Sequence, residues 1–265
     1  MLLEGLRASR RLIRRVSPGS VLLLCLYLPL LAHAELPDQP LDVVIYGASG
    51  AAGTRLLNEA LRRNHRVTAV TRDSSRIVGG RRNLQIVEGD IVDVDSVARI
   101  TAGADVVILS VRGSIDGSDN PASTVHRVAV EQLVEVLRAA PDSQTRLLIV
   151  GGAGSLEVRP GVTYAESIPR LLRLFIPREL RREIAGHRLT LAYLATVDDV
   201  PWTYVSPPKS FKPGRRTGAY QLAGKRLAYD ARGRSRISME DYAIALLDEA
   251  ERAEHIHEHI SVLGK

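Results

Sequence analysis

Residues 41–72 constrain the fold more than any other part of this 265-residue chain. The segment begins with an apolar, β-branched run and continues into three glycines with the spacing G-x-x-G-x-x-G. Leucines and alanines at helical spacing follow, and a second β-branched run ends the segment. Buried parallel strands are short apolar runs of this kind. The segment therefore predicts a strand, a tight turn, a helix and a second strand.

The spacing of the three glycines predicts a phosphate-binding turn. Gly47 lets the chain leave the strand sharply, Gly50 leaves room for a pyrophosphate beside the backbone, and Gly53 lets the helix pack closely. Free N–H groups and the positive end of the helix dipole would then face the phosphate oxygens. Because a strand precedes the motif and a helix and strand follow it, the motif indicates a dinucleotide site rather than a simple connection.

The end of the second strand, at 67–71, bears on which dinucleotide is bound. In this fold that position lies beside the adenosine ribose, where a carboxylate binds the 2′-hydroxyl of NAD and a cation accommodates the 2′-phosphate of NADP. Arg72 occupies it, about twenty residues beyond the turn. We therefore expect NADP(H) to be preferred over NAD(H). Asp73 is the alternative ribose ligand if the register differs by one residue.

Short apolar runs continue to alternate with helical patterns along the chain. The pattern predicts further strands at 84–87, 105–111, 146–150, 202–205 and 260–263, and helices at 95–100, 123–140, 168–196 and from Ser238 onward. Strands that alternate with helices indicate a parallel sheet with right-handed crossovers. We predict one α/β domain at 41–265, a Rossmann-type doubly wound parallel sheet with helices on both faces and a small C-terminal elaboration.

Residues 1–34 have the composition of a secretory signal peptide. Five arginines precede an apolar run at 21–31, and small residues occupy the −3 and −1 positions of a cleavage site after Ala34. An early Arg-Arg pair also resembles a twin-arginine signal, whose route carries folded proteins. Export with cleavage after Ala34, leaving no stable membrane span, is the favoured interpretation. The alternatives are an uncleaved anchor, or a mis-assigned start and a cytoplasmic protein that begins near Glu35.

The basic excess of the chain lies mostly in this leader. The formal net charge of the whole chain is +6, and residues 1–34 carry five arginines against one glutamate. The remainder has a net charge of only about +2, so no nucleic-acid partner is indicated. Cys25 is the single cysteine and lies in the leader. A cleaved chain would therefore have no thiol for a disulfide, for catalysis or for a zinc site.

Two clusters of charged or titratable residues have simpler interpretations than a ligand site. His255, His257 and His259 alternate in a possible strand, and with several glutamates nearby they are interpreted as an exposed polar edge rather than a metal site. The arginines at 178, 181 and 182 are interpreted as the solvated side of a helix. We expect no metal.

Several motifs together resemble those of a known family. They are GASGAAG at 47–53, the strand end at Thr71-Arg72, VGGAGSL at 150–156, WTYVSPPKSFKPGRRTGAY and SRISMEDYAIALLDE. These resemble the NAD(P)H-binding, NmrA-like atypical short-chain dehydrogenases. Within that group the chain is most similar to bacterial NADH-flavin reductases, which are similar to flavin/biliverdin IXβ reductase. The likeness runs from about residue 41 to the C-terminus, and the last two motifs are its more restricted features.

The resemblance implies a cofactor site residue by residue. Along the pyrophosphate it places Gly47, Ser49, Gly50, Ala51 and Ala52, with Gly53 in the same turn, and it places Arg72 at the 2′-phosphate. Beside the adenine it places Asp90 and Ile91, and beside the nicotinamide ribose Ser110, Val111 and Arg112. At the nicotinamide it places Gly152 and the turn that contains Pro207. All of these follow the carboxyl ends of strands, where open α/β sheets bind ligands.

The end of the site where chemistry would occur is less specific. Standard short-chain dehydrogenases use Tyr-x-x-x-Lys, in which the lysine lowers the pKa of the tyrosine so that the phenol can exchange a proton with the substrate. No tyrosine here has a lysine four residues later; Tyr204 and Tyr220 have one at five. The missing pair argues against alcohol dehydrogenase or epimerase chemistry.

Two functions follow from these features. The first is an NADPH-dependent oxidoreductase that transfers hydride to a small-molecule acceptor, a flavin or a similar flat conjugated compound. Ser110, Arg112 and Ser155 are the candidates to contact that acceptor, and Tyr164 is a candidate to stack on it. The alternative is a non-catalytic NAD(P)-binding sensor or regulator of the NmrA type.

Overall fold

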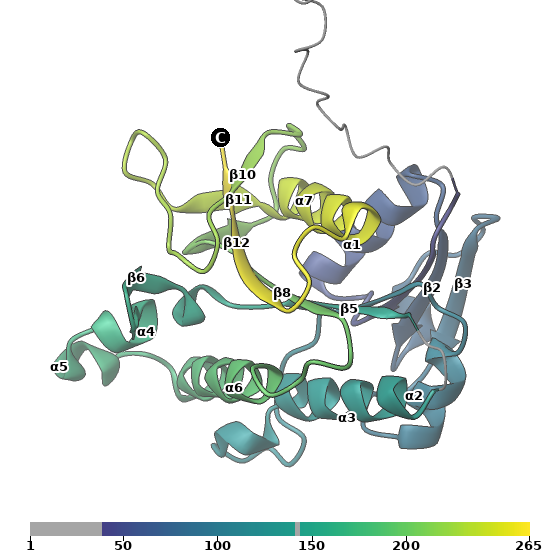
Figure 1. The fold of residues 1–265 in the computed structure, drawn as a ribbon, viewed down its shortest axis with the longest axis horizontal. Helices are drawn as coiled ribbons and strands as arrows, with labels where there is room; N and C mark the ends of the chain where they lie inside the picture. The colour runs from purple at the N-terminus through teal and green to yellow at the C-terminus, as the bar shows by residue number, and fades with distance from the viewer. Residues whose placement is uncertain (1–38, 141–143) are drawn as a thin grey trace, which may run out of the picture. The chain divides into compact units, whose positions relative to one another are not determined.

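The structure is a computed structural model that describes residues 39–140 and 144–265; the predicted leader lies outside these residues. Its centre is an eight-stranded sheet with the strand order β10-β12-β8-β5-β4-β1-β2-β3 (Figure 1). All neighbouring strands are parallel except β10, which pairs antiparallel with β12. This is the strand order of the dinucleotide-binding fold with two strands added at one edge. The predicted fold class is confirmed.

The elements follow the predicted alternation closely in the first half of the chain. In chain order they are β1 (Asp42–Tyr46), α1 (Ala51–Arg62), β2 (Arg66–Thr71), β3 (Leu84–Glu88), α2 (Val94–Thr101), β4 (Val106–Leu109), α3 (Val125–Ala139) and β5 (Arg146–Val150). The second half has β6 (Glu157–Arg159), β7 (Val162–Thr163), α4 (Tyr164–Ser167), α5 (Arg170–Arg173), α6 (Arg178–Leu194), β8 (Trp202–Ser206), β9 (Ser210–Lys212), β10 (Tyr220–Leu222), β11 (Arg236–Ser238), α7 (Met239–Arg252) and β12 (Glu258–Gly264).

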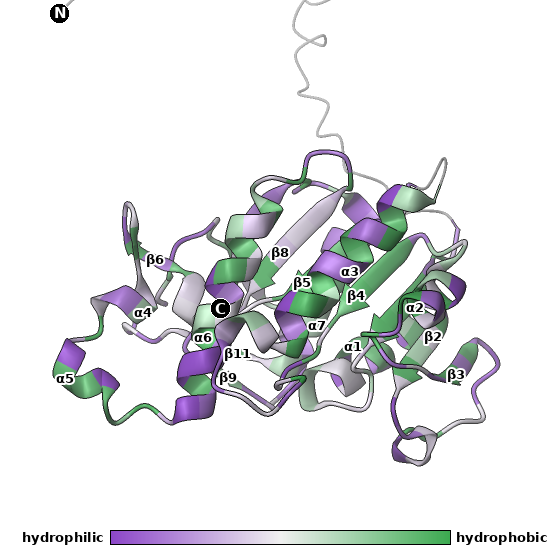
Figure 2. Ribbon diagram, turned by 90° about the horizontal axis from the view of Figure 1, so that it is seen from below, coloured by the Kyte–Doolittle hydropathy of each residue, from purple (hydrophilic) through white to green (hydrophobic). Residues whose placement is uncertain are grey.

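Helices cover both faces of the sheet, as Figures 1 and 2 show. Helices α1 and α7 lie on one face, and α2, α3 and α6 lie on the other. Because side chains alternate along a strand, β1 contributes to both cores: Val43 and Ile45 pack into the core under α1 and α7, and Val44 and Tyr46 into the opposite one. The buried apolar runs predicted as strands thus form the middle layer of the fold.

The segment predicted to be mostly helical at 168–196 is divided into separate helices. Pro169 is the N-cap residue of α5, and Pro177 is the N-cap residue of α6. A proline lacks the N–H that a helix interior needs and its ring clashes with the preceding turn. The chain therefore begins a new helix after each proline, and α5 has only four residues.

The histidines at 255–259 do not form the predicted exposed polar edge. His257 has a φ of 58° and precedes β12, so it does not alternate with the next histidine along a strand. His259 lies in β12, which is internal because β10 covers its outer side. Its Nε2 is 2.9 Å from the Ser206 hydroxyl oxygen, and His255 Nδ1 is 2.7 Å from a carboxylate oxygen of buried Glu249.

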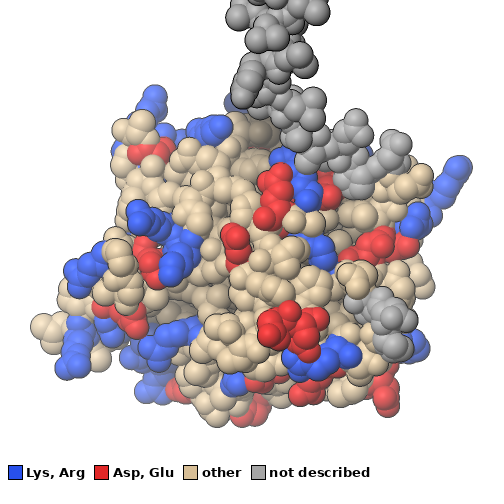
Figure 3. All heavy atoms as spheres, in the orientation of Figure 1, with Lys and Arg blue, Asp and Glu red and all other residues tan. Residues whose placement is uncertain are grey.

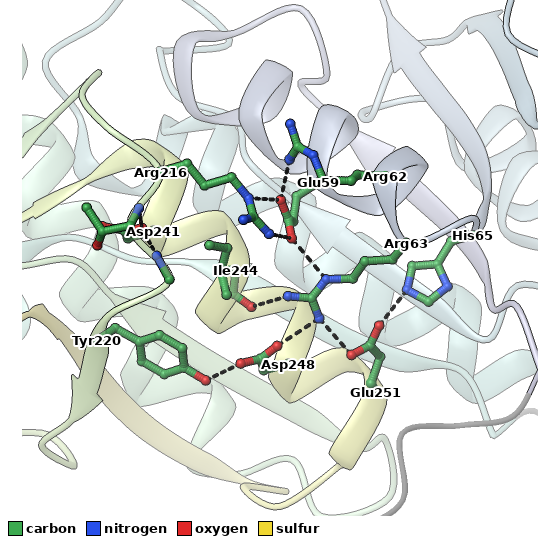
Figure 4. Close-up of polar contacts among 12 residues, drawn as sticks. Glu59, Arg62, Arg63, His65, Arg216, Tyr220, Asp241, Ile244, Asp248 and Glu251 are labelled. Carbon is green, nitrogen blue, oxygen red and sulfur yellow. Dashed lines mark hydrogen bonds and ion pairs between the residues drawn. The ribbon is translucent and has the colours of Figure 1, made fainter.

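A buried carboxylate connects α1 to the C-terminal third of the chain (Figure 4). Glu59 is 2% exposed and accepts hydrogen bonds from Arg62, Arg63 and Arg216, with ion-pair distances of 2.6, 3.1 and 2.8 Å. Burial alone would raise the pKa of Glu59, but the hydrogen bonds from Arg216 and Arg63 outweigh it and lower the pKa to about 2. The charge is therefore retained inside the protein.

Candidate functional site

The glycine turn after β1 has the close contacts that its sequence predicts. Gly47 has a φ of +78°, and a Cβ there would lie 2.3 Å from the carbonyl oxygen of Ser110. At Gly53 a Cβ would lie 2.0 Å from the carbonyl oxygen of Gly47, so the first turn of α1 packs directly on the strand end. At Gly50 the nearest atom would be 3.2 Å away. The turn is thus tight on the inside and open at Gly50.

The N-terminus of α1 fits a phosphate group. Gly50 is the N-cap residue and has no side chain to cap the helix, and the first turn contains no acidic residue. The N–H groups at the start of a helix have no partner within the helix, so here they are available to an anion. Ala51 and Ala52 keep the approach free of bulk. The residues present therefore fit the pyrophosphate of a dinucleotide.

On the side of β2 and β3, the turn opens into a cavity of about 680 Å³, which we call the adenosine cavity. It is lined by the predicted residues Gly47, Ser49, Gly50, Arg72, Asp90, Ile91, Ser110, Val111 and Arg112, together with Asp73 and Arg76. The carboxylate of Asp73 accepts hydrogen bonds from the backbone N–H and hydroxyl of Ser75, at 3.1 and 2.6 Å. These bonds lower the pKa of Asp73. One oxygen of the Asp73 carboxylate is thus engaged by Ser75, and Asp73, Arg72 and Arg76 are all exposed.

On the other side of the turn lies a second cavity of about 940 Å³, the nicotinamide cavity. It shares Gly50, Ser110, Val111 and Arg112 with the adenosine cavity, so the two are halves of one cleft. Its other lining residues include the predicted Ala51, Ala52, Gly152, Ser155 and Tyr164. Pro207 is buried and does not line either cavity, although Lys209 and Phe211, a few residues later, line the second one.

The three residues predicted to contact the acceptor, Ser110, Arg112 and Ser155, differ in whether their polar groups already bind other protein groups. Ser110 and Arg112 line both cavities where they meet. The Ser155 hydroxyl donates to the carbonyl oxygen of Gly152 at 2.8 Å and lies 3.2 Å from the Ser206 hydroxyl. Ser155 is therefore tied to neighbouring protein groups. Tyr164 lines the nicotinamide cavity with the Lys209 ammonium 4.6 Å from its ring centre.

His187 on α6 also lines the nicotinamide cavity, although the sequence pattern did not single it out. Its Nδ1 is 2.6 Å from the Tyr204 hydroxyl oxygen. Its Cδ2 and Nε2 edge packs on Gly152, where a Cβ would lie 3.2 and 3.3 Å from these atoms. No local motif signals this histidine, because its partner comes from the following strand and Gly152 from an earlier loop.

The surroundings of His187 set its protonation state. Burial, and then the charge of Arg112, lower the pKa of His187 to about 4, so the imidazole is neutral at pH 7. Burial raises the pKa of the Tyr204 phenol, which therefore stays protonated and can donate to Nδ1. In that tautomer Nε2 carries the hydrogen. The imidazole is thus arranged to offer a hydrogen-bond donor at its Gly152 edge.

Comparison with known proteins agrees with this geometry. The model of the NAD(P)H-binding family matches residues 47–250, which include the turn, both cavities and most of the sheet. The chain belongs to this NAD(P)H-binding family. It is an atypical short-chain dehydrogenase-like protein, and its cofactor is a nicotinamide dinucleotide. The family assignment made from the motifs is confirmed.

Three solved structures show how far the similarity extends. A presumed epimerase from Bacteroides thetaiotaomicron is 31% identical with a TM-score of 0.73, over 85% of this chain and 98% of its own. A presumed exported protein from Burkholderia pseudomallei is 34% identical with a TM-score of 0.69, over 84% and 99%. A presumed NADH-flavin reductase from Streptococcus pneumoniae is 31% identical with a TM-score of 0.69, over 85% and 100%.

Two findings bear on the cellular location. Within residues 39–140 and 144–265, none of the helices combines the length and the apolar character that a membrane crossing needs. The predicted signal peptide lies outside the described residues. One of the three similar structures carries the name of an exported protein.

Proposed function

We propose that this protein is an NADPH-dependent oxidoreductase that transfers hydride to a flavin or a similar flat conjugated acceptor. The observation that carries the proposal is the nicotinamide cavity, about 940 Å³ of space next to the phosphate-binding turn. A reduced nicotinamide held there supplies the hydride. The protein then needs to bind the two reactants side by side in the correct orientation.

The lining of this cavity suits a flat conjugated molecule. Most of its large side chains are apolar or aromatic: Val111, Ile168, Leu180, Ile184, Phe211, Met239 and Tyr164. Such walls bind a ring system through area and stacking rather than through many hydrogen bonds. The name of the Streptococcus pneumoniae structure supports this choice of acceptor. The epimerase name of another relative fits less well here, because Tyr204 is fully buried and bonded to a histidine instead of a lysine.

We assign the role of charge stabilisation to His187. Negative charge develops on a conjugated acceptor when hydride arrives, and a fixed hydrogen-bond donor stabilises it. A neutral imidazole with its hydrogen on Nε2 is such a donor, and Tyr204 holds it in that tautomer. The proton that completes the reduction then comes from solvent. Arg112, at the junction of the two cavities, adds a positive charge on the same side.

The preference for NADPH rests on the adenosine cavity. Arg72 and Arg76 line the end of that cavity where the ribose is expected. Asp73, the competing ribose ligand, directs its carboxylate to Ser75. The two exposed arginines favour a 2′-phosphate over a 2′-hydroxyl.

The proposal is tested by steady-state oxidation of NADPH and NADH with FMN, riboflavin and small quinones as acceptors. We expect turnover with at least one flat acceptor and a lower KM for NADPH than for NADH. Tight NADPH binding without turnover of any acceptor would contradict the oxidoreductase and favour the alternative, a sensor or regulator of the NmrA type.

We also propose that residues 1–34 are a signal peptide that is cleaved after Ala34. A twin-arginine route would carry the folded protein across the membrane together with its bound NADP(H). The name of the Burkholderia pseudomallei structure supports export. N-terminal sequencing of the native protein from fractionated cells should find Glu35 as the first residue outside the cytoplasm. A chain that starts near Glu35 in the cytosol would instead indicate a mis-assigned start, and an intact Met1 in membranes would indicate an anchor.

A further inference from the structure

An exposed apolar surface lies on the segment around α5. Five large apolar side chains within ten residues are more than half exposed: Leu171 (76%), Leu172 (55%), Leu174 (71%), Phe175 (84%) and Leu180 (51%). The other exposed large apolar side chains of the described residues are scattered over several elements. Soluble proteins seldom expose such a cluster unless it binds something. We call residues 168–182 the α5 surface.

The α5 surface is also strongly basic. Residues 168–182 contain five arginines and one glutamate, a formal net charge of +4 in a chain whose remainder beyond the leader is nearly neutral. Arg170, Arg178 and Arg181 are exposed. Arg173 donates to the backbone carbonyls of Glu166 and Ile168, so it holds the segment in shape without losing its charge. Figure 3 shows Lys and Arg side chains gathered on the side of the molecule where α5 and the start of α6 lie.

The position of this surface connects it to the cofactor cleft. Helix α5 projects at the side of the sheet away from β3 in both ribbon views (Figures 1 and 2). Ile168, Pro177 and Leu180 line the nicotinamide cavity, and Leu180 is at the same time half exposed on the α5 surface. The apolar wall of the cavity therefore continues outward into the exposed patch.

We propose that the α5 surface docks on an anionic lipid bilayer. Leucine and phenylalanine side chains insert at the boundary of headgroups and acyl chains, and the arginines contact lipid phosphates. A second copy of the chain fits less well, because a symmetric interface brings the same +4 segments face to face. Docking places the mouth of the nicotinamide cavity against the lipid, so an apolar acceptor dissolved in the bilayer can enter it directly. The binding itself does not depend on the proposed reaction.

The test is co-sedimentation of the protein with vesicles, using a chain that begins at Glu35 so that the leader does not bind lipid. The similarity to the three solved structures spans 84–85% of this chain and 98–100% of theirs, and the family model matches residues 47–250. Both findings support independent folding of a chain that lacks the leader. We expect binding to vesicles of phosphatidylcholine with phosphatidylglycerol, weaker binding at high salt, and little binding to phosphatidylcholine alone.

Two sets of variants locate the binding surface. The triple change Leu171→Ser, Leu174→Ser and Phe175→Ser should lower vesicle affinity at least tenfold, and Arg170→Gln with Arg181→Gln should lower it and flatten its salt dependence. Val78→Ser with Val94→Ser, which are exposed apolar residues elsewhere, is the matched control and should bind as the unchanged protein does. All of these side chains are exposed, so thermal unfolding should be unaltered.

Three outcomes would overturn the proposal. The first is no binding to anionic vesicles, and the second is equal binding by the triple serine variant. The third is a protein that does not bind vesicles but forms a dimer in sedimentation velocity, with the triple serine variant remaining monomeric. That result would assign the α5 surface to contact with a second copy of the chain. NADPH oxidation measured in parallel with a water-soluble acceptor separates this result from a failure of the proposed reaction.

Discussion

At the scale of single residues, we expect Arg72 to decide which dinucleotide the cleft prefers. The adenosine cavity is lined by three exposed arginines, Arg72, Arg76 and Arg112, and by the carboxylates of Asp73 and Asp90; Ser75 binds one oxygen of the Asp73 carboxylate. Position in the sequence alone does not decide whether Arg72 or Asp73 contacts the adenosine ribose, because they are neighbours at the end of one strand. The Asx turn that Asp73 makes with Ser75 supports the choice of Arg72, and it is a local side-chain geometry that spacing does not reveal.

Arg72→Ser should weaken NADPH binding at least tenfold and leave NADH binding nearly unchanged. A charge-assisted hydrogen bond to a phosphate contributes about 1.5–3 kcal/mol, and NADH lacks that phosphate. The measurement is fluorescence titration of both cofactors. Arg81→Ser is the control, since Arg81 is also exposed but does not line the adenosine cavity. An equal loss of affinity for both cofactors would contradict the assignment.

His187→Phe should reduce turnover about tenfold to a hundredfold while changing NADPH affinity little, because the hydrogen bond is needed only as charge develops on the acceptor. Tyr204→Phe should give a smaller loss, since it removes only the bond that fixes the tautomer. The measurement is kcat and KM for each variant with the acceptor that the unchanged protein uses best. A change in KM for NADPH alone would give His187 a purely structural role in binding.

At the scale of elements, the two most restricted sequence motifs prove to be one structural unit. Strand β9 pairs with β11, and Asp241 at the start of α7 accepts from the backbone of Thr217 and Gly218. Ser238 accepts from the Asp241 N–H, so the predicted N-cap of α7 is confirmed. The carboxylate of Asp241, however, serves a distant loop rather than its own helix end. These motifs therefore hold the C-terminal third together beside the cleft.

The network around Glu59 extends this unit to α1. Arg63 pairs with Glu251 and Asp248 of α7 at 2.7 and 2.8 Å in addition to its bond to Glu59. Arg216, from the loop between β9 and β10, completes the network. Burying charges is favourable only when each has its partners, and here every carboxylate has at least one arginine. The network thus fixes how α1, and with it the phosphate-binding turn, sits on the rest of the protein.

Glu59→Gln should lower the free energy of unfolding by about 1.5–3 kcal/mol, because it leaves charged hydrogen-bond donors partly unsatisfied in the interior. Glu131→Gln is the matched control: Glu131 also pairs with an arginine one helical turn away, but it is about one third exposed and should cost under about 1 kcal/mol. Urea unfolding at pH 7 measures both. Equal effects of the two changes would show that the buried network adds nothing.

The elements that the sequence could not predict are short or depend on distant partners. Strands β1, β2, β4, β5 and β8 were predictable because their β-branched runs are buried on both faces. By contrast, β6, β7 and β10 have two or three residues each, too few to show the apolar–polar alternation that predicts a strand. The division of 168–196 was signalled by Pro169 and Pro177, whose power to end a helix outweighs the surrounding helical pattern.

For the molecule as a whole, buried neutral histidines set the response to acid. Burial lowers the pKa of His126 well below its ordinary value and lowers the pKa values of His187 and His259 to about 4. Between about pH 6.5 and pH 4 the unfolded chain takes up protons at these positions and the native protein does not. Stability is therefore lost as the pH falls through this window. The carboxylate of Glu59, whose pKa is about 2, adds its own loss only below about pH 4.5.

The free energy of unfolding should decline steadily from about pH 6.5 to pH 4, and His259→Gln should make that decline less steep because one proton-binding difference is removed. Urea titrations at a series of pH values measure the slope. His257→Gln is the control, since His257 is exposed at the surface. A stability that is constant across this range would mean that the histidines are protonated in the native state.

The two ends of the cleft were predictable to different degrees. At the phosphate end, Gly47 and Gly53 meet backbone requirements that only glycine satisfies, and Gly50 leaves space for a phosphate, so the sequence predicts this end of the cleft. At the nicotinamide end, His187 gains its properties from Tyr204 and Gly152, which are distant in sequence. These contacts of His187 form only when α6, β5 and β8 pack together, so the spacing of residues within one element cannot predict them.

The place of β12 in the sheet has a consequence for how the chain matures. β12 is the last strand in the described part of the chain, yet it lies between β8 and β10, with Ile260, Val262 and Leu263 buried. Until it inserts, β8 presents an open edge of unpaired backbone groups, which invites pairing with other chains. The sheet is thus complete only when β12 is in place, and we expect a chain that lacks residues 258–264 to aggregate rather than to form a smaller working protein.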